Sequence, residues 1–569
     1  MNSIKSNILL FGLAGMMLAS CTDSFLDTTS KTTLTSTNYY KNQSQAEAAV
    51  VGCYDQYQRT VSNGNWPTLF QAAETMGDDC FGGGGSGDLA NKLLDRMDQS
   101  YNTAETNIFG GIWGDYYKCI YNCNLLIESL DNISFSSDNE RKIVEGQARA
   151  IRGLAYFDLV KMFENVPLLT KPSSEKVPQA NPDDVYKQIV EDLKYAADNI
   201  PAGEFTDNSA TLGHISRYAA GAMLARVYLF YDGVYNDNGF KEMPGGLTKA
   251  DALKYCEDVI NSGYYKLEDN FADLWPGSST KPSKKEEGRK TTYKEDSKEL
   301  LWVVKFNNDQ NWVNNNYNSN RFVVNIGMPG VWSAPYAIGW GACPITPYAH
   351  SLFTSDDKRG EATVINTRNL VCTNGQTAYE QQIAQDVGDF SGYYIKKYTP
   401  MCYSDGTSMV AAESDVAGAD FMISQDQDWV LMRYADVLLM AAELGSTNAA
   451  QDYNLVMYRA YGNHNHDVAG TPTRQQIWQE RRKEFMGEGL RYFDLRRQGL
   501  DTFVKAIAGQ ANDNGQESGT PSKVYVNKEE KTIADTFKEQ NIRSKRGFWQ
   551  IPSSEISLSG GVYKQNAGW

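Results

Sequence analysis

The fold of this chain is decided by the stretch Lys142-Ile-Val-Glu-Gly-Gln-Ala-Arg-Ala-Ile-Arg-Gly-Leu-Ala-Tyr-Phe-Asp-Leu-Val-Lys-Met-Phe163. Its apolar residues recur at the spacing of a long amphipathic helix, and Pro167 ends the segment because proline cannot continue a helix. Further helical patterns precede and follow it, at residues 45–57, 112–130, 183–200, 216–231 and 250–262. Paired helices that recur every few tens of residues predict a helical-repeat solenoid.

The second half of the chain has a different character. Leu300 to Phe306 is β-branched and aromatic, which predicts a strand. Residues 307–348 lack a helical period but are rich in aromatic residues, and such a long irregular segment is usually functional. Helical patterns return at residues 428–444, 452–461 and 474–488. We therefore predict a mostly α-helical protein with a helical N-terminal domain at 45–265. A loop-rich C-terminal domain at 266–569 carries short strands and closing helices within 428–500.

An export segment precedes the body of the chain. Lys5 supplies a positive charge, Ile8 to Leu18 is apolar, and small residues then precede Cys21. The apolar run is too short to span a bilayer, which takes about 20 residues, and this order of features is typical of a signal peptide. We expect residues 1–20 to be removed and Cys21 to be lipidated, with residues 21–44 as a polar tether. An ordinary secretory signal is the alternative.

Composition excludes several classes of function. The net charge is −16 at pH 7, and an acidic balance argues against nucleic acid as a partner. The nine cysteines are dispersed and form no CxxC pair, so we expect neither a structural zinc site nor another cofactor. The glycine run at residues 82–85 lacks the Gly-Lys-Ser/Thr that a phosphate-binding loop needs. We interpret it as a flexible surface loop near a binding face.

Several short motifs occur in the order that one known family shows. They are Ser24-Phe-Leu-Asp27, Ala148-Arg-Ala-Ile-Arg-Gly-Leu-Ala-Tyr-Phe-Asp-Leu159, Arg433-Tyr-Ala-Asp-Val-Leu-Leu-Met-Ala-Ala-Glu443, Glu480-Arg-Arg-Lys-Glu-Phe485 and Gly487-Glu-Gly-Leu-Arg-Tyr-Phe-Asp-Leu-Arg-Arg497. From Cys21 to Trp569 the chain resembles the SusD/RagB-like nutrient-binding lipoproteins of the Bacteroidetes outer membrane. The resemblance implies a tetratricopeptide-like helix-pair scaffold, no catalysis, and a location at the cell surface. It also implies a partner, a SusC-like TonB-dependent transporter, which imports the captured oligosaccharide or polysaccharide.

Candidate ligand-binding residues are aromatic, amide-bearing or acidic, because sugars need flat apolar faces together with planar polar groups. The resemblance to the starch-binding family member implies that Trp340 stacks on ligand and that Asp78 or Asp79 binds it. The glycine run replaces the tryptophans that follow the acid in that member, which argues against starch. The other candidates are Trp66, Trp312, Trp332 and Tyr336, with the amides of Asn311, Asn314, Asn315 and Asn316. For the aromatic candidates the alternative is packing inside the protein, and for the two aspartates it is a turn or helix end.

A charged cluster near the C-terminus has the composition of an active site. Its members are Arg433, Asp436, Arg481, Arg482, Glu484, Arg491, Asp494 and Arg496. We interpret them as buried or half-buried ion pairs that join the C-terminal helices to the solenoid.

Three functions remain open from the sequence. The first is a non-enzymatic glycan-binding lipoprotein, the second a peptide-binding lid of the same architecture, and the third a surface glycosidase. A glycosidase needs two carboxylates at a set separation across the bond, and the sequence does not place such a pair. His464 and His466 could bind a metal, but their polar loop favours a solvated role.

Overall fold

The computed structural model describes residues 39–61, 65–85, 87–307, 318–404, 422–512, 523–526, 529–532 and 539–569. Cys21, the signal peptide and most of the tether therefore lie outside the described residues, as do Trp312 and the four candidate asparagines. Within the described part of the chain, no helix combines the length and the apolar character that a membrane span requires.

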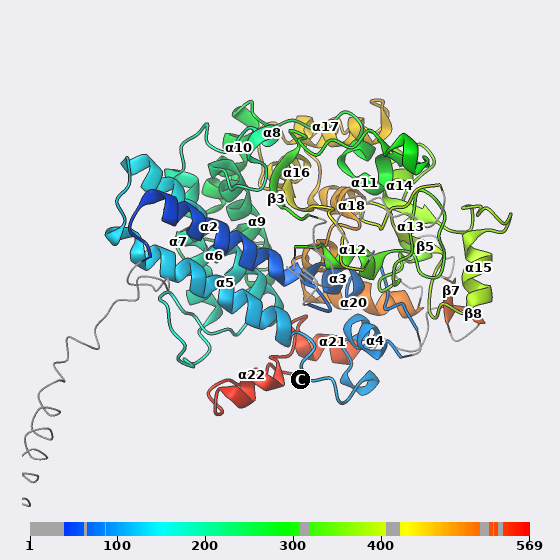
Figure 1. Ribbon diagram of the computed structural model, residues 1–569, viewed down its shortest axis with the longest axis horizontal. Helices are drawn as coiled ribbons and strands as arrows, with labels where there is room; N and C mark the ends of the chain where they lie inside the picture. The colour runs from blue at the N-terminus through cyan, green and yellow to red at the C-terminus, as the bar shows by residue number, and fades with distance from the viewer. Residues whose placement is uncertain are drawn as a thin grey trace, which may run out of the picture.

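The first half of the chain is a stack of antiparallel helices, on the left of Figure 1. Its main helices are α2 (Gln43–Gln58), α5 (Gly110–Ser129), α6 (Asp138–Phe163), α7 (Pro182–Asn199), α9 (Arg217–Tyr235) and α10 (Lys249–Asn261). Helix α2 packs on α5, α5 on α6, α6 on α7, α7 on α9, and α9 on α10. The predicted mostly α-helical, tetratricopeptide-like scaffold is confirmed.

Local sequence signals define where these helices begin and how closely they pack. The Ser137 side chain accepts a hydrogen bond from the N–H of Glu140 and so caps α6. A Cβ at Gly153 would lie 3.2 Å from Cγ of Leu193, so glycine allows α6 and α7 to approach closely. Between the same helices, Nη2 of Arg152 lies 2.6 Å from Oδ1 of Asp192 in a buried ion pair.

The predicted strand at Leu300 to Phe306 is confirmed as β3 (Leu300–Val304), which pairs antiparallel with β6 (Trp429–Arg433). The helix predicted from residue 428 begins later, as α16 (Tyr434–Glu443). All five β6 side chains are buried, and pairing with β3 supplies backbone hydrogen bonds that outweigh local helix preference. Helix α16 packs on α10 and on α17 (Ala449–Tyr461), which extends the stack into the second half.

The rest of the second half consists of short elements joined by loops, on the right and bottom of Figure 1. Its helices are α11 (Pro276–Ser279), α12 (Arg321–Ile326), α13 (Pro347–Ser351), α14 (Lys358–Thr363), α15 (Ala378–Gln385), α18 (Arg474–Phe485), α19 (Arg491–Arg496), α20 (Leu500–Asn512), α21 (Glu539–Lys545) and α22 (Ser553–Leu558). The earlier helices α3 (Leu69–Thr75), α4 (Leu89–Arg96) and α8 (Asn208–Thr211) have 7, 8 and 4 residues. Three more two-stranded antiparallel sheets pair β1 (Thr280–Lys281) with β2 (Lys290–Thr291), β4 (Val364–Asn366) with β5 (Tyr393–Ile395), and β7 (Lys523–Val526) with β8 (Glu529–Thr532).

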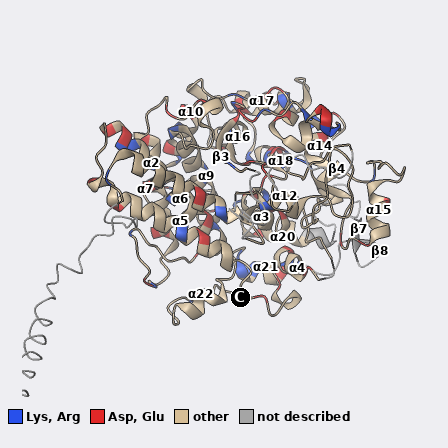
Figure 2. Cartoon of the chain, viewed as in Figure 1, with Lys and Arg blue, Asp and Glu red and all other residues tan. Residues whose placement is uncertain are grey.

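One large hydrophobic cluster runs through both halves, from Tyr40 to Tyr563. A smaller cluster around Met328 and Tyr394 forms the interior of the loop-rich part. Acidic and basic residues are interspersed along the helices of the first half (Figure 2). The two halves therefore share a core, and the second half provides the irregular surface.

The charged C-terminal cluster is a scaffold, as predicted. Asp436 is buried and pairs with both Arg226 of α9 and Arg481 of α18, which ties the helical stack to the second half. Arg497 reaches Glu443 with its Nη1 at 2.6 Å from Oε1. Arg496 is the exception, because its Nε donates to the carbonyl of Arg546 at 2.5 Å.

Glu74 on α3 gives the fold a pH dependence. Its buried Oε1 accepts a hydrogen bond of 2.6 Å from the N–H of Gly489, and burial raises the pKa of its carboxyl to about 8. The unfolded chain loses this proton near the ordinary pKa of about 4.3. Between these two values the folded state retains a proton that the unfolded state releases, so stability falls as pH rises through this window.

We expect Glu74→Gln to remove this pH dependence. The amide oxygen can still accept from Gly489, and the variant should be more stable than the wild type at pH 8 by about 1 kcal/mol or more. At pH 5 the difference should be small. Urea unfolding at both pH values measures it, and an equal difference between variant and wild type at pH 5 and pH 8 would contradict the prediction.

Candidate functional site

Trp340 lies on a loop whose backbone is fixed against the end of α12. The N–H of Trp340 donates to the carbonyl of Val324 at 2.8 Å, and the N–H of Gly341 donates to that of Gly327 at 2.8 Å. The Trp340 side chain is nevertheless 37% exposed. A rigid backbone therefore presents an indole to solvent, which is the geometry of a stacking surface for a ligand.

Arg321, at the start of α12, lies next to the Trp340 indole. Its guanidinium carbon lies 4.2 Å from the centroid of the Trp340 ring, a cation–π contact. Its Nη1 donates to the carbonyl of Met422 at 2.7 Å. Trp340 and Arg321 together form what we call the Trp340 platform. Sequence analysis did not predict the role of Arg321, because nothing in its local sequence distinguishes it from a surface arginine.

The glycine run at residues 82–85 packs against the loop that carries Trp340. The prediction of a flexible surface loop is wrong. Residues 82–84 are buried, and the N–H of Gly83 donates to the carbonyl of Ala342 at 3.1 Å. A Cβ at Gly83 would lie only 2.5 Å from the carbonyl oxygen of Gly341. Glycine is needed here because two backbones approach each other more closely than a side chain allows.

Asp78 and Asp79, which we predict to bind ligand, have surroundings that favour a structural role. Both are buried, and Arg491 and Arg482 from the C-terminal part neutralise them. Nε of Arg491 lies 2.5 Å from Oδ1 of Asp78, and these arginines hold the pKa of Asp78 well below its usual range against the opposing effect of burial. The alternative of a structural acid applies, because the carboxylates face partners more than 400 positions away in the chain.

Trp66 remains a candidate. Its side chain is 39% exposed, and it precedes α3 through a cis peptide bond to Pro67. Helix α3 is fixed to α12 by the stacked rings of Phe70 and Phe322, whose centroids are 4.0 Å apart. Trp66 and the Trp340 platform are therefore carried by two short helices that pack directly on each other.

The remaining aromatic candidates differ in burial. Tyr336 is buried in the smaller hydrophobic cluster, which favours the alternative of packing inside the protein. Trp332 is half-buried and stays a candidate. Trp312 cannot be placed, since it lies outside the described residues.

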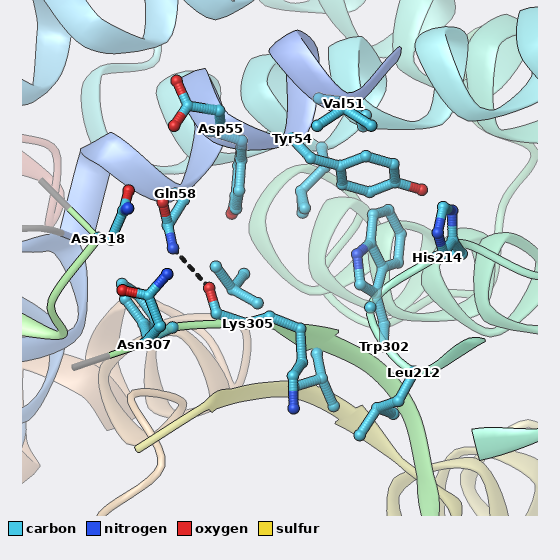
Figure 3. A pocket seen from close by; sticks show the side chains of 17 residues that line it. Val51, Tyr54, Asp55, Gln58, Leu212, His214, Trp302, Lys305, Asn307 and Asn318 are labelled. Atoms are coloured by element: carbon cyan, nitrogen blue, oxygen red, sulfur yellow. Dashed lines mark hydrogen bonds between the residues drawn. The ribbon is translucent and has the colours of Figure 1, made fainter. Parts of the chain in front are cut away.

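A second candidate site, a pocket of about 350 Å³, opens between α2, β3 and residues 212–214 (Figure 3). Its walls include the side chains of Tyr54, Gln58, His214, Trp302, Asn307 and Asn318. The Gln58 amide donates to the Lys305 carbonyl at 2.6 Å, and burial lowers the pKa of His214. Aromatic rings beside amides suit a small ligand with one apolar and one polar side.

This pocket was missed by sequence analysis. Tyr54 and Trp302 occur within regular helix and strand patterns, where an aromatic residue is usually part of the core. Only the packing of α2 across β3 leaves a space between them. No local sequence signal could have found it.

The two histidines of the polar loop are engaged with neighbouring side chains. Nδ1 of His464 lies 2.9 Å from Oδ2 of Asp467, and Nε2 of His466 lies 3.0 Å from Oδ2 of Asp356. Across the residues that the structure places, no group of three or more His, Cys, Asp or Glu side chains has the arrangement of a metal site.

Comparison with known families agrees with this architecture. A model described as the SusD family matches residues 298–569, and one described as starch-binding associating with outer membrane matches residues 24–229. SusD-like protein P25 of Formosa agariphila is 21% identical over 530 residues, which cover 87% of this chain and 90% of that protein. A SusD-like protein of Bacteroides ovatus is 24% identical over 280 residues, and this match spans 48% of this chain and only 47% of that relative.

Solved structures share the fold over nearly the whole chain. Surface glycan-binding protein A from Bacteroides thetaiotaomicron, in complex with laminarihexaose, superposes with a TM-score of 0.69 at 21% identity. The superposition covers 93% of this chain and 100% of that one. The two family models and these likenesses together show that this chain belongs to the SusD/RagB-like family.

Proposed function

We propose that this protein is a non-enzymatic glycan-binding lipoprotein of the outer membrane, facing the cell surface. It captures an oligosaccharide or polysaccharide and delivers it to a SusC-like TonB-dependent transporter. The observation that carries this proposal is the Trp340 platform, an exposed indole on a fixed loop, in a family whose solved members include a glycan-binding protein in complex with laminarihexaose. Trp66 and Trp332 extend the proposed ligand surface, and the pocket of Figure 3 is a second place for ligand.

The absence of catalysis is part of the proposal. Hydrolysis of a glycosidic bond needs two carboxyl groups that reach the substrate. Asp78 and Asp79 are buried against arginines, and Asp436 and Glu484 of the charged cluster are likewise buried in ion pairs. These acids hold the scaffold together, and they are not available to a sugar.

The remaining parts of the proposal concern the anchor and the domains. Lipid on Cys21 anchors the chain, and residues 21–44 act as the tether. The helical domain at 45–265 is the scaffold, and the domain at 266–569 carries the ligand surface. The match of residues 24–229 to a family model described as associating with the outer membrane supports this location.

A peptide-binding lid is the second candidate. The pocket of Figure 3 could serve it, because the lining of Tyr54, Trp302 and neighbouring aliphatic side chains suits an apolar side chain of a peptide as well as a sugar. The two candidates differ in the ligands that purified protein retains.

Affinity electrophoresis of the chain from Thr22 onward tests the proposed function. We expect migration to be retarded in gels that contain one class of polysaccharide, with no reducing sugar released over many hours. Retardation by no polysaccharide in a broad panel, together with binding of peptide mixtures, would replace the glycan proposal by the peptide one. Release of sugar that increases with time would show a glycosidase instead.

A further inference from the structure

Arg321 is a half-buried cation without an acidic partner. Its Nη1 donates to the Met422 carbonyl, while its Nε is buried without a hydrogen-bond partner in the structure. Among the described residues, no carboxylate forms an ion pair with it, and its guanidinium carbon lies 4.2 Å from the centroid of the Trp340 ring. Burial lowers the pKa of Arg321 to about 10, so the guanidinium is still charged at neutral pH.

Most of the buried arginines of this protein are neutralised, with Arg496 as an exception whose guanidinium donates to the carbonyl of Arg546. Arg359, Arg433 and Arg491 each pair with one or more buried carboxylates. Removing a charge from water is costly, and proteins normally offset that cost with a counter-charge. The chain as a whole carries a net charge of −16, so acids are abundant, and yet none of the described residues places a carboxylate in an ion pair with Arg321.

We infer that the ligand supplies the missing counter-charge: the glycan bound at the Trp340 platform carries an oxyanion, a uronic acid carboxylate or a sulfate ester, that Arg321 receives. The inference rests on the proposed function and deepens it by assigning the chemical class of the glycan. A guanidinium binds carboxylate and sulfate oxygens through charge-assisted hydrogen bonds. Nη2, which makes no hydrogen bond to the described residues, is the donor that remains for such a group.

The adjoining indole explains how such a ligand is oriented. The Trp340 ring takes the apolar C–H face of a sugar, and Arg321 stacks on the same ring. An acidic substituent on that sugar would then lie next to the guanidinium. Neutral sugars could use only the ring and the weaker hydrogen bonds from Arg321 to hydroxyl groups.

Titration calorimetry with three oligosaccharides of similar length tests this inference. The probes are an oligogalacturonate, a sulfated galactan oligosaccharide, and neutral laminarihexaose, each measured at 50 and 300 mM NaCl. We expect at least one acidic probe to bind 10-fold or more tightly than the neutral one, with an affinity that falls at high salt. The two acidic probes distinguish a carboxylate from a sulfate.

Two variants separate a charge contact from a merely structural role. Arg321→Gln should weaken binding of the acidic probe 10-fold or more and binding of any neutral probe by a clearly smaller factor, while Arg321→Lys should retain part of the preference. An unfolding midpoint equal to that of the wild type, measured by thermal denaturation, would confirm that both variants fold. Tighter binding of the neutral probe, or equal losses for all probes in Arg321→Gln, would overturn the inference and leave glycan binding intact. Binding of no probe by the wild type would overturn the inference, and the gel assay with a broad polysaccharide panel would decide the proposed function separately.

Discussion

Replacing Arg433 by alanine should lower the free energy of unfolding by about 3–5 kcal/mol, because it leaves buried carboxylates without their counter-charge. Arg433 ends β6 and is almost completely buried. Its Nη1 lies 2.7 Å from Oε1 of Glu299 and 2.5 Å from Oε1 of Glu484, and its Nε lies 2.9 Å from Oε2 of Glu488. These acids come from two separate segments, the residue before β3 and the end of α18 with the turn that follows it, so one side chain links both.

The network around Arg433 is balanced in charge. Its cations are Arg359, Lys397, Arg433, Arg459 and Lys483, and its acids are Glu299, Asp357, Glu480, Glu484 and Glu488. Removing one cation leaves an uncompensated negative charge away from water. Protons would be drawn to the remaining acids, so the loss of stability should be larger at pH 8 than at pH 5.

Equilibrium unfolding in urea at pH 7 measures the effect of Arg433→Ala. Arg141→Ala is the matched control, because Arg141 forms an exposed ion pair with Asp131, and such pairs contribute little. We expect the control to unfold close to the wild-type midpoint. Equal, small changes in both variants would show that the buried network does not stabilise the fold.

Replacing Trp340 by alanine should weaken glycan binding about 10-fold or more, because central aromatic contacts typically contribute about 2 kcal/mol or more. Backbone hydrogen bonds hold the loop at Trp340, and the substitution does not remove them. The loop should therefore keep its conformation. Stability should change little, since the indole is partly exposed already. The variant therefore separates binding from folding.

The control for Trp340→Ala is Tyr264→Ala. Tyr264 is also 37% exposed, but it follows α10 in the helical half. Calorimetry with the polysaccharide class retained in the gel assay should show wild-type affinity for Tyr264→Ala and a loss for Trp340→Ala. Wild-type affinity in both variants would exclude the Trp340 platform as the principal site.

The helical scaffold could be predicted because it depends on local sequence. Helices such as α6 and α7 carry an apolar face at helical spacing and end at proline or cap residues, and these signals are independent of the rest of the chain. The prediction was wrong at Trp429–Arg433, where pairing with a distant strand outweighs local preference. The family could be identified from the order of its motifs for the same reason that the helices could be predicted. Both signals lie in the linear sequence.

The candidate site was predicted only in part. Trp340 is proposed from the resemblance, and the ion pairs of Asp78 and Asp79 could not be foreseen because their partners, Arg482 and Arg491, are distant in sequence. The glycine run was misread because close contact between two backbones leaves no local signal. Arg321 could not be predicted either, because its role follows from the lack of a carboxylate partner among the described residues. Only a structure shows such a lack.

The most direct test of the account is a crystal structure of the protein with the oligosaccharide that it retains. We expect a sugar ring stacked on the indole of Trp340, with one of its polar substituents within hydrogen-bonding distance of Arg321. Ligand bound only in the pocket between α2 and β3, or elsewhere on the molecule with the Trp340 indole left open to solvent, would contradict the account.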